Sequence, residues 1–170
     1  MFSVIGRVVA VLPDNIDTDI IYPGRYLNVT DREKTPEHLF ELAYPGIRAK
    51  LQRGDILVGG KNFGCGSSRE QAAAAIKFAG AGAVIAASFA RIFYRNAINL
   101  GLPLIIAPDA IAGLGEGDDL EIDMAAGRIA NKTRGEEYRA AKLDPRAIEL
   151  LESGGLIPFL KKQYAEAAHA

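Results

Sequence analysis

Apolar residues in the middle of the chain fall in short runs that alternate with longer amphipathic segments. The stretches 55–59, 83–87 and 102–107 are largely apolar and have the length of buried strands. Between them, 68–79 and 89–100 have the length and the apolar spacing of helices. Buried strands alternating with helices are typical of parallel strands joined by crossover helices. The pattern predicts an α/β fold.

The first third of the chain gives weaker signals. Residues 3–12 are mainly β-branched and apolar, which predicts a strand, and 13–28 is a long loop rich in polar and turn-forming residues. A loop of that length in a compact domain is usually functional. Thr35-Pro36 has the form of a helix start, so we expect a helix from there to about Ala43, ended by Tyr44-Pro45-Gly46.

The last third predicts smaller elements. Residues 120–123 and 128–130 form a candidate hairpin, Asp144-Pro145 begins a short helix, and 156–168 forms a terminal helix. No internal repeat, low-complexity tract or linker interrupts the sequence, so we expect one domain spanning 1–170.

Composition narrows the function classes. A net charge of -1 gives no basic surface of the kind that binds nucleic acid or anionic membranes. No apolar run is long enough to span a bilayer and no signal peptide is apparent, so we expect a cytoplasmic protein. Cys65 is the single cysteine, which excludes an intrachain disulfide and an iron–sulfur cluster ligated by this chain alone.

The segment 60–70, Gly-Lys-Asn-Phe-Gly-Cys-Gly-Ser-Ser-Arg-Glu, carries most of the candidate chemistry. It lies between a predicted strand and a predicted helix, where free backbone N–H groups and the positive end of the helix dipole meet. Ser67, Ser68 and Arg69 add two hydroxyls and a guanidinium at the same place. This combination favours binding of a small anion, most plausibly a carboxylate, with proton transfer as a further possibility.

Two purely structural interpretations compete with that one. Ser67 and Glu70 have the spacing of a capping box. Gly64 and Gly66 supply the first two glycines of a dinucleotide-binding turn, but Arg69 stands where that turn needs a third. The capping box leaves the glycines and Arg69 unexplained, and the nucleotide interpretation is weak.

Other candidates are ambiguous by themselves. Asp14, Asp17 and Asp19 form turns in a solvated loop, or one of them orients a catalytic group or a metal-bound water; their spacing does not decide. A helix N-terminus and Arg69 would lower the pKa of Cys65, but no histidine lies near it to act as a base. We interpret Cys65 as an oxidation-sensitive bystander.

Three segments together resemble a known family. Asp17-Thr18-Asp19, the run from Gly64 to Glu70 and Ser88-Phe89-Ala90-Arg91-Ile92 occur in the order found in the swivel domain of the aconitase superfamily. Within it, the chain looks like the small subunits of the isopropylmalate dehydratases. The resemblance covers about 3–160, nearly the whole chain.

The resemblance implies a fold and an activity. The fold is a three-layer β/β/α swivelling domain, and the activity is that of a hydro-lyase that removes water from a hydroxy acid and adds it back at the neighbouring carbon. For isopropylmalate this reaction belongs to leucine biosynthesis. A 4Fe–4S cluster serves as Lewis acid in the family, and its cysteines lie in a large subunit. The implied partners are that large subunit and a hydroxy-dicarboxylate substrate.

The resemblance also assigns roles to particular residues. Ser67 matches the serine that acts as base on the carbon-bound proton, and Asp19 matches an aspartate of the active-site hydrogen-bond network. Ser68 and Arg69 match groups that support this serine and bind substrate. With Ser67 in a catalytic role, Glu70 and Ser68 remain to cap the helix.

Substrate choice is expected to depend on Asn28 and Val29. Relatives that act on tricarboxylates carry an arginine just after a Tyr-Leu pair, whereas here Tyr26-Leu27 is followed by Asn28 and Val29. This favours an alkyl-substituted malate such as isopropylmalate. The alternatives are a sister hydro-lyase acting on dimethylmalate, methylmalate or homoaconitate and, in another class, a non-catalytic anion-binding regulatory module.

Overall fold

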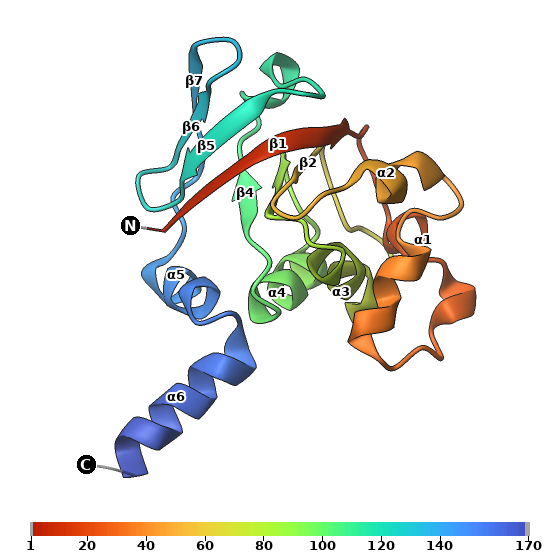
Figure 1. The fold of residues 1–170 in the computed structure, drawn as a ribbon, viewed down its shortest axis with the longest axis vertical. Helices are drawn as coiled ribbons and strands as arrows, with labels where there is room; N and C mark the ends of the chain where they lie inside the picture. Colours follow the sequence, from red (N-terminus) through yellow and green to blue (C-terminus); the bar gives the residue numbers. More distant parts are fainter. Residues whose placement is uncertain (1, 169–170) are drawn as a thin grey trace.

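A computed structural model describes residues 2–168 as a mixed β-sheet covered by helices (Figure 1). The strand order across the sheet is β4-β3-β2-β1-β5-β6-β7. Strands β1 to β4 pair in parallel, and β5 to β7 extend the other edge of β1 in antiparallel pairing. The strands of the described residues are β1 (Ser3–Val11), β2 (Ile56–Gly59), β3 (Ala83–Ala86), β4 (Leu104–Ile106), β5 (Asp119–Asp123), β6 (Arg128–Asn131) and β7 (Glu136–Arg139).

Strand β1 belongs to both halves of the sheet. Its residues 3–7 pair with β5, and from residue 8 onward it pairs with β2. Gly6 lies at the change of partner, where an added Cβ would come 2.1 Å from the carbonyl oxygen of Gly54. A side chain there would push the two strands apart. The switch separates an antiparallel layer from the parallel layer, and both appear above helices α3 and α4 in Figure 1.

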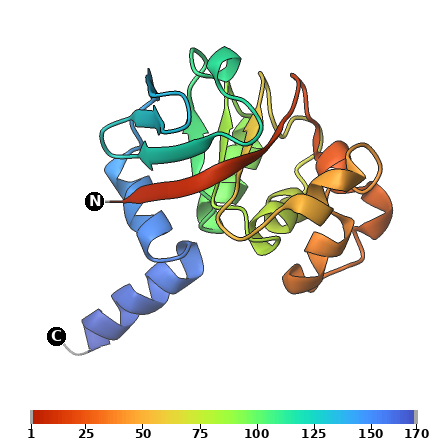
Figure 2. The same ribbon diagram turned by 45° about the horizontal axis from the view of Figure 1, so that its top comes forward.

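The helices lie mainly on one side of the parallel strands. Every residue of β2 and β3 is buried, as expected for strands covered on both faces. Small buried side chains at 72–75 let α3 approach the sheet closely. Figure 2 shows α6 extending away from the rest of the domain. The α-helices are α1 (Thr18–Ile21), α2 (Pro45–Lys50), α3 (Glu70–Phe78), α4 (Arg91–Asn99), α5 (Pro145–Glu152) and α6 (Leu156–Ala168), and the 3₁₀ helices are η1 (Gly24–Tyr26), η2 (Arg32–His38) and η3 (Ile111–Gly113).

The predicted parallel core, the hairpin and the last two helices are confirmed. Asp144 caps α5 by accepting a hydrogen bond from the N–H of Arg146. Among residues 2–168, none of the helices combines the length and the apolarity that a membrane crossing requires.

The predicted helix from Thr35-Pro36 to Ala43 is wrong. This region forms the 3₁₀ helix η2, which is capped by Asp31 and contains Pro36. Leu39 is extended and Phe40 has a φ of 54°, and both side chains are at most 1% exposed. A regular α-helix cannot include Phe40 in this left-handed conformation, so the chain leaves the helical path after His38.

Three further differences concern element limits and one missed strand. Pro45 does not end a helix but begins α2 as its first residue, a position that suits proline because the missing N–H has no partner there. The loop 13–28 contains α1 and η1. Strand β7 was not predicted, because Glu136–Arg139 is charged and largely exposed, as is common at a sheet edge.

Asp118 fixes the antiparallel layer. It is 4% exposed and accepts hydrogen bonds from the N–H of Gly115 at 2.8 Å, from Asn131 at 2.8 Å and from Arg134 at 2.9 Å. Burial alone would raise the pKa of this carboxyl, but the three donors outweigh it and lower the pKa. The charged form is therefore the one that the fold stabilises.

Candidate active site

The long loop after β1 lies against the glycine-rich turn before α3. The N–H of Gly64 donates to the carbonyl of Ile16 at 2.7 Å, and the N–H of Thr18 donates to the carbonyl of Cys65 at 2.8 Å. Asp17 and Cys65 form an isolated parallel bridge. The segments that the sequence left about 45 residues apart are thus joined by backbone hydrogen bonds, at the carboxyl end of the parallel strands.

Two of the glycines are required by the backbone. Gly64 has a φ of 80°, and a Cβ there would come 2.1 Å from the Phe93 ring. Gly66 has a φ of 97°, in the region that residues with side chains rarely adopt. These positions turn the chain sharply between β2 and α3, so that the residues after Gly66 reach the surface beside the loop.

The Ser67 side chain is exposed to solvent, and the Thr18 side chain lies within hydrogen-bonding distance of it. The Oγ of Ser67 lies 3.3 Å from the Oγ1 of Thr18, and either hydroxyl can donate. Thr18 is 2% exposed, so its hydroxyl is fixed beneath the serine. Sequence reasoning assigned Thr18 no role, although it stands within the Asp-Thr-Asp motif, because the contact with Ser67 forms only in the fold.

The predicted capping of α3 is wrong. The helix begins at Glu70 with Arg69 as N-cap residue, and within residues 2–168 no side chain hydrogen-bonds to the first N–H groups of the helix. Glu70 instead forms an ion pair with Arg32. Ser68 is exposed. The first N–H groups of α3 therefore have no side-chain acceptor, which favours an anion at this helix start, and Ser67 is not used as a cap.

Arg69 and Asp19 form the second part of the site. Arg69 Nη1 donates to Asp19 Oδ1 at 2.6 Å, and the N–H of Gly24 donates to the same oxygen at 2.8 Å. The Arg69 guanidinium, followed by the Gly24 N–H, holds the pKa of the Asp19 carboxyl below its ordinary value. A Cβ on Gly24 would come 2.9 Å from Arg69 Nη2. Asp19 therefore orients Arg69, and Gly24 leaves room for both.

The other two aspartates of the loop serve the backbone. Asp17 caps α1 by accepting from the N–H of Ile20 at 2.8 Å, and Asp14 accepts from the N–H of Lys61 at 2.7 Å. The structure thus agrees with the turn-forming interpretation for Asp14 and Asp17, whereas Asp19 forms an ion pair with Arg69.

The predicted specificity residues lie close to the start of α3. Gln71 donates to the carbonyl of Leu27 at 3.4 Å, which holds the loop against the helix. Asn28 is exposed, and Val29 is half-buried in a small cavity of about 210 Å³ whose other walls include Glu70 and Gln71. Arg32 also lines this cavity. Sequence reasoning missed this arginine, which stands three residues after Val29.

The side chains of residues 2–168 do not form a metal site. Among residues 2–168, no three His, Cys, Asp or Glu side chains come together in a group that could hold a metal ion. Cys65 is a free, half-buried thiol at the turn. The described residues therefore do not fit a 4Fe–4S cluster, which needs several thiolates.

The arrangement suits proton transfer on a bound carboxylic acid. An exposed hydroxyl, a guanidinium held by a carboxylate and the open start of a helix lie along one short segment, 67–70. Positive charge and N–H groups attract a carboxylate and lower the cost of placing negative charge on Ser67.

Comparisons with known proteins point to the same family as the residues of the candidate site. A family model described as the aconitase C-terminal domain matches residues 10–109. A 3-isopropylmalate dehydratase small subunit from Moorella thermoacetica is 53% identical over 150 residues, which cover 88% of this chain and 90% of that protein. A methanogen homoaconitase small subunit from Methanothermobacter thermautotrophicus is 50% identical over 144 residues, covering 85% and 83%.

Structural similarity extends over the whole chain. The crystal structure of 3-isopropylmalate dehydratase (LeuD) from Methanocaldococcus jannaschii has a TM-score of 0.91 at 41% identity and covers 99% of both chains. The predicted swivel-domain fold and the family resemblance are thereby confirmed. The chain belongs to the aconitase family, in the group of swivel domains that includes the 3-isopropylmalate dehydratase small subunits.

Proposed function

We propose that this chain is the small subunit of a hydro-lyase that interconverts 2-isopropylmalate and 3-isopropylmalate, and that Ser67 is its base. The observation that carries the proposal is the convergence of Ser67, Arg69 and Asp19 beside the start of α3, with the buried Thr18 hydroxyl beneath Ser67. The names and the extent of similarity of the relatives support the reaction class.

Ser67 receives the proton that leaves the substrate carbon. A free serine hydroxyl ionises far above neutral pH, so the alkoxide needs stabilisation. The open N-terminus of α3, the positive charge of Arg69 and a hydrogen bond donated by Thr18 supply it. The exposed Ser67 side chain is accessible to a substrate.

Arg69 and Ser68 bind a substrate carboxylate. The guanidinium already points its Nη1 at Asp19, which leaves the other donors of the fork for a ligand. Asp19 acts by holding Arg69 in place. Asp19 and Arg69 therefore act together, and loss of either one should raise the KM for the substrate.

A large subunit is the proposed partner, and we expect it to carry the 4Fe–4S cluster. The single cysteine of this chain cannot ligate one. The names of the relatives, which are small subunits, support a two-subunit enzyme. A cytoplasmic location stays a prediction.

An alkylmalate is the proposed substrate class. Val29 presents an apolar side chain next to the start of α3, and the charge of neighbouring Arg32 is paired with Glu70. A tricarboxylate such as homoaconitate is the second candidate, because Arg32 stands beside Val29 and a homoaconitase subunit is among the similar proteins. Comparing kcat/KM for 3-isopropylmalate and homoaconitate distinguishes the two.

Ser67→Ala tests the proposal in a complex reconstituted with a cluster-bearing large subunit. We expect kcat to fall by at least about a hundredfold, as for loss of a positioned base. The Tm and the affinity for the large subunit should stay close to wild type, because Ser67 is exposed and caps no helix. Ser153→Ala, which removes a serine hydroxyl at the end of α5, is the matched control and should keep full activity.

The opposite pattern would count against catalysis by Ser67. A loss of only a few-fold in kcat together with a lower Tm would make the serine structural. Wild-type turnover by the Ser67→Ala complex would favour the non-catalytic anion-binding module. Dehydratase activity of this chain without a large subunit would contradict the proposed partner.

A further inference from the structure

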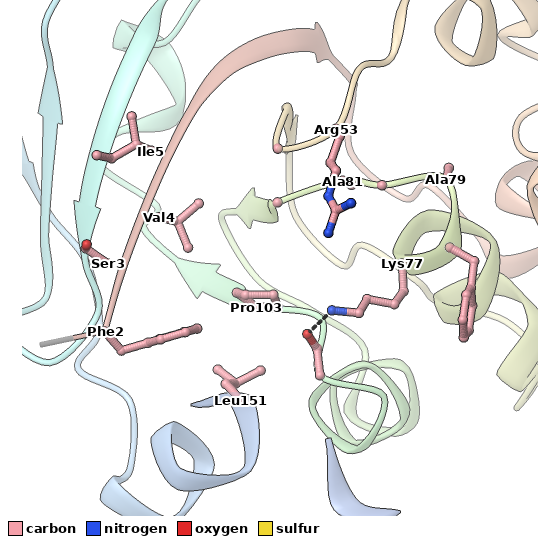
Figure 3. Close-up of a pocket in the computed structure, with 15 residues that line it drawn as sticks. Phe2, Ser3, Val4, Ile5, Arg53, Lys77, Ala79, Ala81, Pro103 and Leu151 are labelled. Atoms are coloured by element: carbon pink, nitrogen blue, oxygen red, sulfur yellow. Dashed lines mark hydrogen bonds between the residues drawn. The ribbon is translucent and has the colours of Figure 1, made fainter. Parts of the chain in front are cut away.

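A second candidate binding site lies at the amino ends of the parallel strands, whereas Ser67 lies at their carboxyl ends. It is a cavity of about 720 Å³, shown in Figure 3. Its walls come from the start of β1, the loops that precede β2, β3 and β4, the end of α3 and one side chain of α5. The nine residues of α3, at about 1.5 Å per residue, place it roughly 14 Å from the Ser67 turn. This cavity is therefore separate from the proposed active site.

The cavity exists because β1 changes partner. Residues 3–7 of β1 pair with β5 and leave the edge that faces β2 open, whereas β2 pairs only from residue 8 of β1 onward. Figure 3 shows β1 along one side of the opening and the loops that carry Arg53 and Ala81 along the other. The space is built by the topology of the fold.

Two cations reach into this space. Figure 3 shows the Arg53 guanidinium and the Lys77 side chain extending into the cavity from the same side. Lys77 is half-buried, and its Nζ donates to the carbonyl of Gly101 at 2.7 Å. Within residues 2–168, neither Arg53 nor Lys77 forms an ion pair with a carboxylate. Two positive charges thus share a cavity without a negative one.

Asp55, the acidic residue nearest to Arg53 along the chain, does not supply a negative charge to this cavity. Asp55 accepts a hydrogen bond from the N–H of Gln52 at 2.8 Å and lines a different cavity together with Arg7. Burial lowers the pKa of Lys77, and the charge of Arg53 lowers it further. A bound anion would counter both effects, because it favours the charged amine.

Part of the remaining wall is apolar. Phe2, Val4, Pro103 and Leu151 gather on the side away from the two cations in Figure 3. Val4 and Leu151 are at most 9% exposed and are part of the hydrophobic core. The volume lies within the range of about 300–1,000 Å³ that is usual for small-molecule sites.

We propose that this cavity binds a small organic anion with one carboxylate head and an apolar tail. The head contacts Arg53 and Lys77, and the tail packs against the apolar wall formed by Phe2, Val4, Pro103 and Leu151. The inference does not depend on the role of Ser67, because it uses no residue of that site.

Titration of the full-length chain with 4-methylpentanoate tests the proposal by ¹H–¹⁵N NMR. We expect saturable shifts at the backbone amides of Gly54, Gly82 and Gly101, which line the cavity, with a Kd on the order of 1 mM for so small a ligand. The uncharged 4-methylpentanamide and the tail-less acetate should each bind about tenfold more weakly, since each lacks one half of the interaction.

Arg53→Gln is the decisive variant, because Arg53 is exposed and its replacement should leave the fold intact. It should weaken 4-methylpentanoate binding by about tenfold. Arg139→Gln, which removes an exposed charge from β7, is the matched control and should bind as wild type does.

Four results would overturn the proposal. They are the absence of saturable shifts, equal affinity for the amide, equal affinity for acetate, and equal losses in Arg53→Gln and Arg139→Gln. The last would mean that net charge alone attracts the ligand. Because Ser67→Ala should bind 4-methylpentanoate unchanged, this proposal and the proposed hydro-lyase function can fail independently.

Discussion

Thr18→Val separates a catalytic contact from a structural one. Valine has nearly the shape of threonine but lacks the hydroxyl, so the change removes the Oγ1 that lies 3.3 Å from Ser67 Oγ. Thr18 is 2% exposed, and its backbone N–H keeps its bond to Cys65 in the variant. The fold should therefore tolerate the change, and the effect should concentrate on Ser67.

The magnitude follows from the charge that Ser67 acquires. The 3.3 Å separation exceeds the roughly 2.7–2.8 Å of a typical hydroxyl–hydroxyl bond, so the contact is weak while Ser67 is neutral. Hydrogen bonds to charged groups contribute about 1.5–3 kcal/mol. Because the resting separation is long, we take the lower end of that range, which corresponds to a loss of about tenfold in kcat. The KM should change little, since the lost hydrogen bond stabilises the alkoxide that takes the proton and involves no group that we assign to substrate binding.

Steady-state kinetics of the reconstituted complex is the assay. Thr18→Ser restores the hydroxyl and should recover most of the lost kcat, whereas Thr133→Val should have no effect. Thr133 is a fair control because its hydroxyl also takes part in one hydrogen bond, accepting from the N–H of Asp119, and it lies in the β6–β7 turn, away from Ser67. A Thr18→Val enzyme within about twofold of wild type in kcat, or a serine variant as slow as the valine one, would refute the reasoning.

Three more changes have defined outcomes. Gly24→Ala places a methyl group 2.9 Å from Arg69 Nη2 and should raise the KM for the substrate by about tenfold, measured by steady-state kinetics. Val29→Arg should shift the ratio of kcat/KM values towards homoaconitate and away from 3-isopropylmalate, by charge pairing with one substrate and an unpaired charge against the other. Asp118→Asn should lower the Tm at pH 7 by several degrees, since the buried donors lose a charged acceptor. The pKa of Asp118 is lowered in the fold, so its contribution to stability is present above the ordinary value of 3.8 and is lost as pH falls through the lower folded value; the Tm difference from wild type should shrink in that range.

Patterning predicted the parallel half of the sheet because its signals are local. Strands β2 and β3 are buried on both faces, which requires continuous apolar runs, and α3 and α4 have apolar stripes that match their burial. In each of these elements, the local sequence pattern favours the structure that the fold requires. The second layer of strands came from the family resemblance, and the position of β1 between a parallel and an antiparallel layer was found only in the structure.

Two similar helix-start signals led to different structures, because one of the two capping residues is buried. Asp144-Pro145 begins α5 as predicted, but Thr35-Pro36 lies inside η2. In the second case Thr35 is itself buried and its hydroxyl donates to the carbonyl of Arg32 at 2.6 Å. Nothing in the Thr-Pro pair indicates that its threonine will be buried in this way. Capping rules work where the tertiary environment leaves the cap in solvent.

The candidate site was predictable in its parts but not in its contacts. Ser67 and Arg69 stood out because the turn that carries them has chemistry that a cap does not need. Thr18 and Arg32 did not, since a threonine in a polar loop and an arginine before a predicted helix are ordinary in sequence. Their importance arises from contacts across about 40 to 50 residues of chain, with Ser67 and with Glu70. Spacing alone cannot give those distances.

The exposure of Ser67 explains why the site should work only within a complex. Two unit charges 4 Å apart interact by about 1 kcal/mol in bulk water and by about 4 kcal/mol at an effective dielectric constant near 20. In the chain alone, the dipole of α3 and the charge of Arg69 act on an exposed hydroxyl through water, where they stabilise an alkoxide little. Covering this face with a partner removes the water and strengthens both interactions without moving either group. The open helix start and the exposed serine are therefore consistent with half of an active site, and in the enzyme that we propose the exclusion of water from Ser67 comes from the partner.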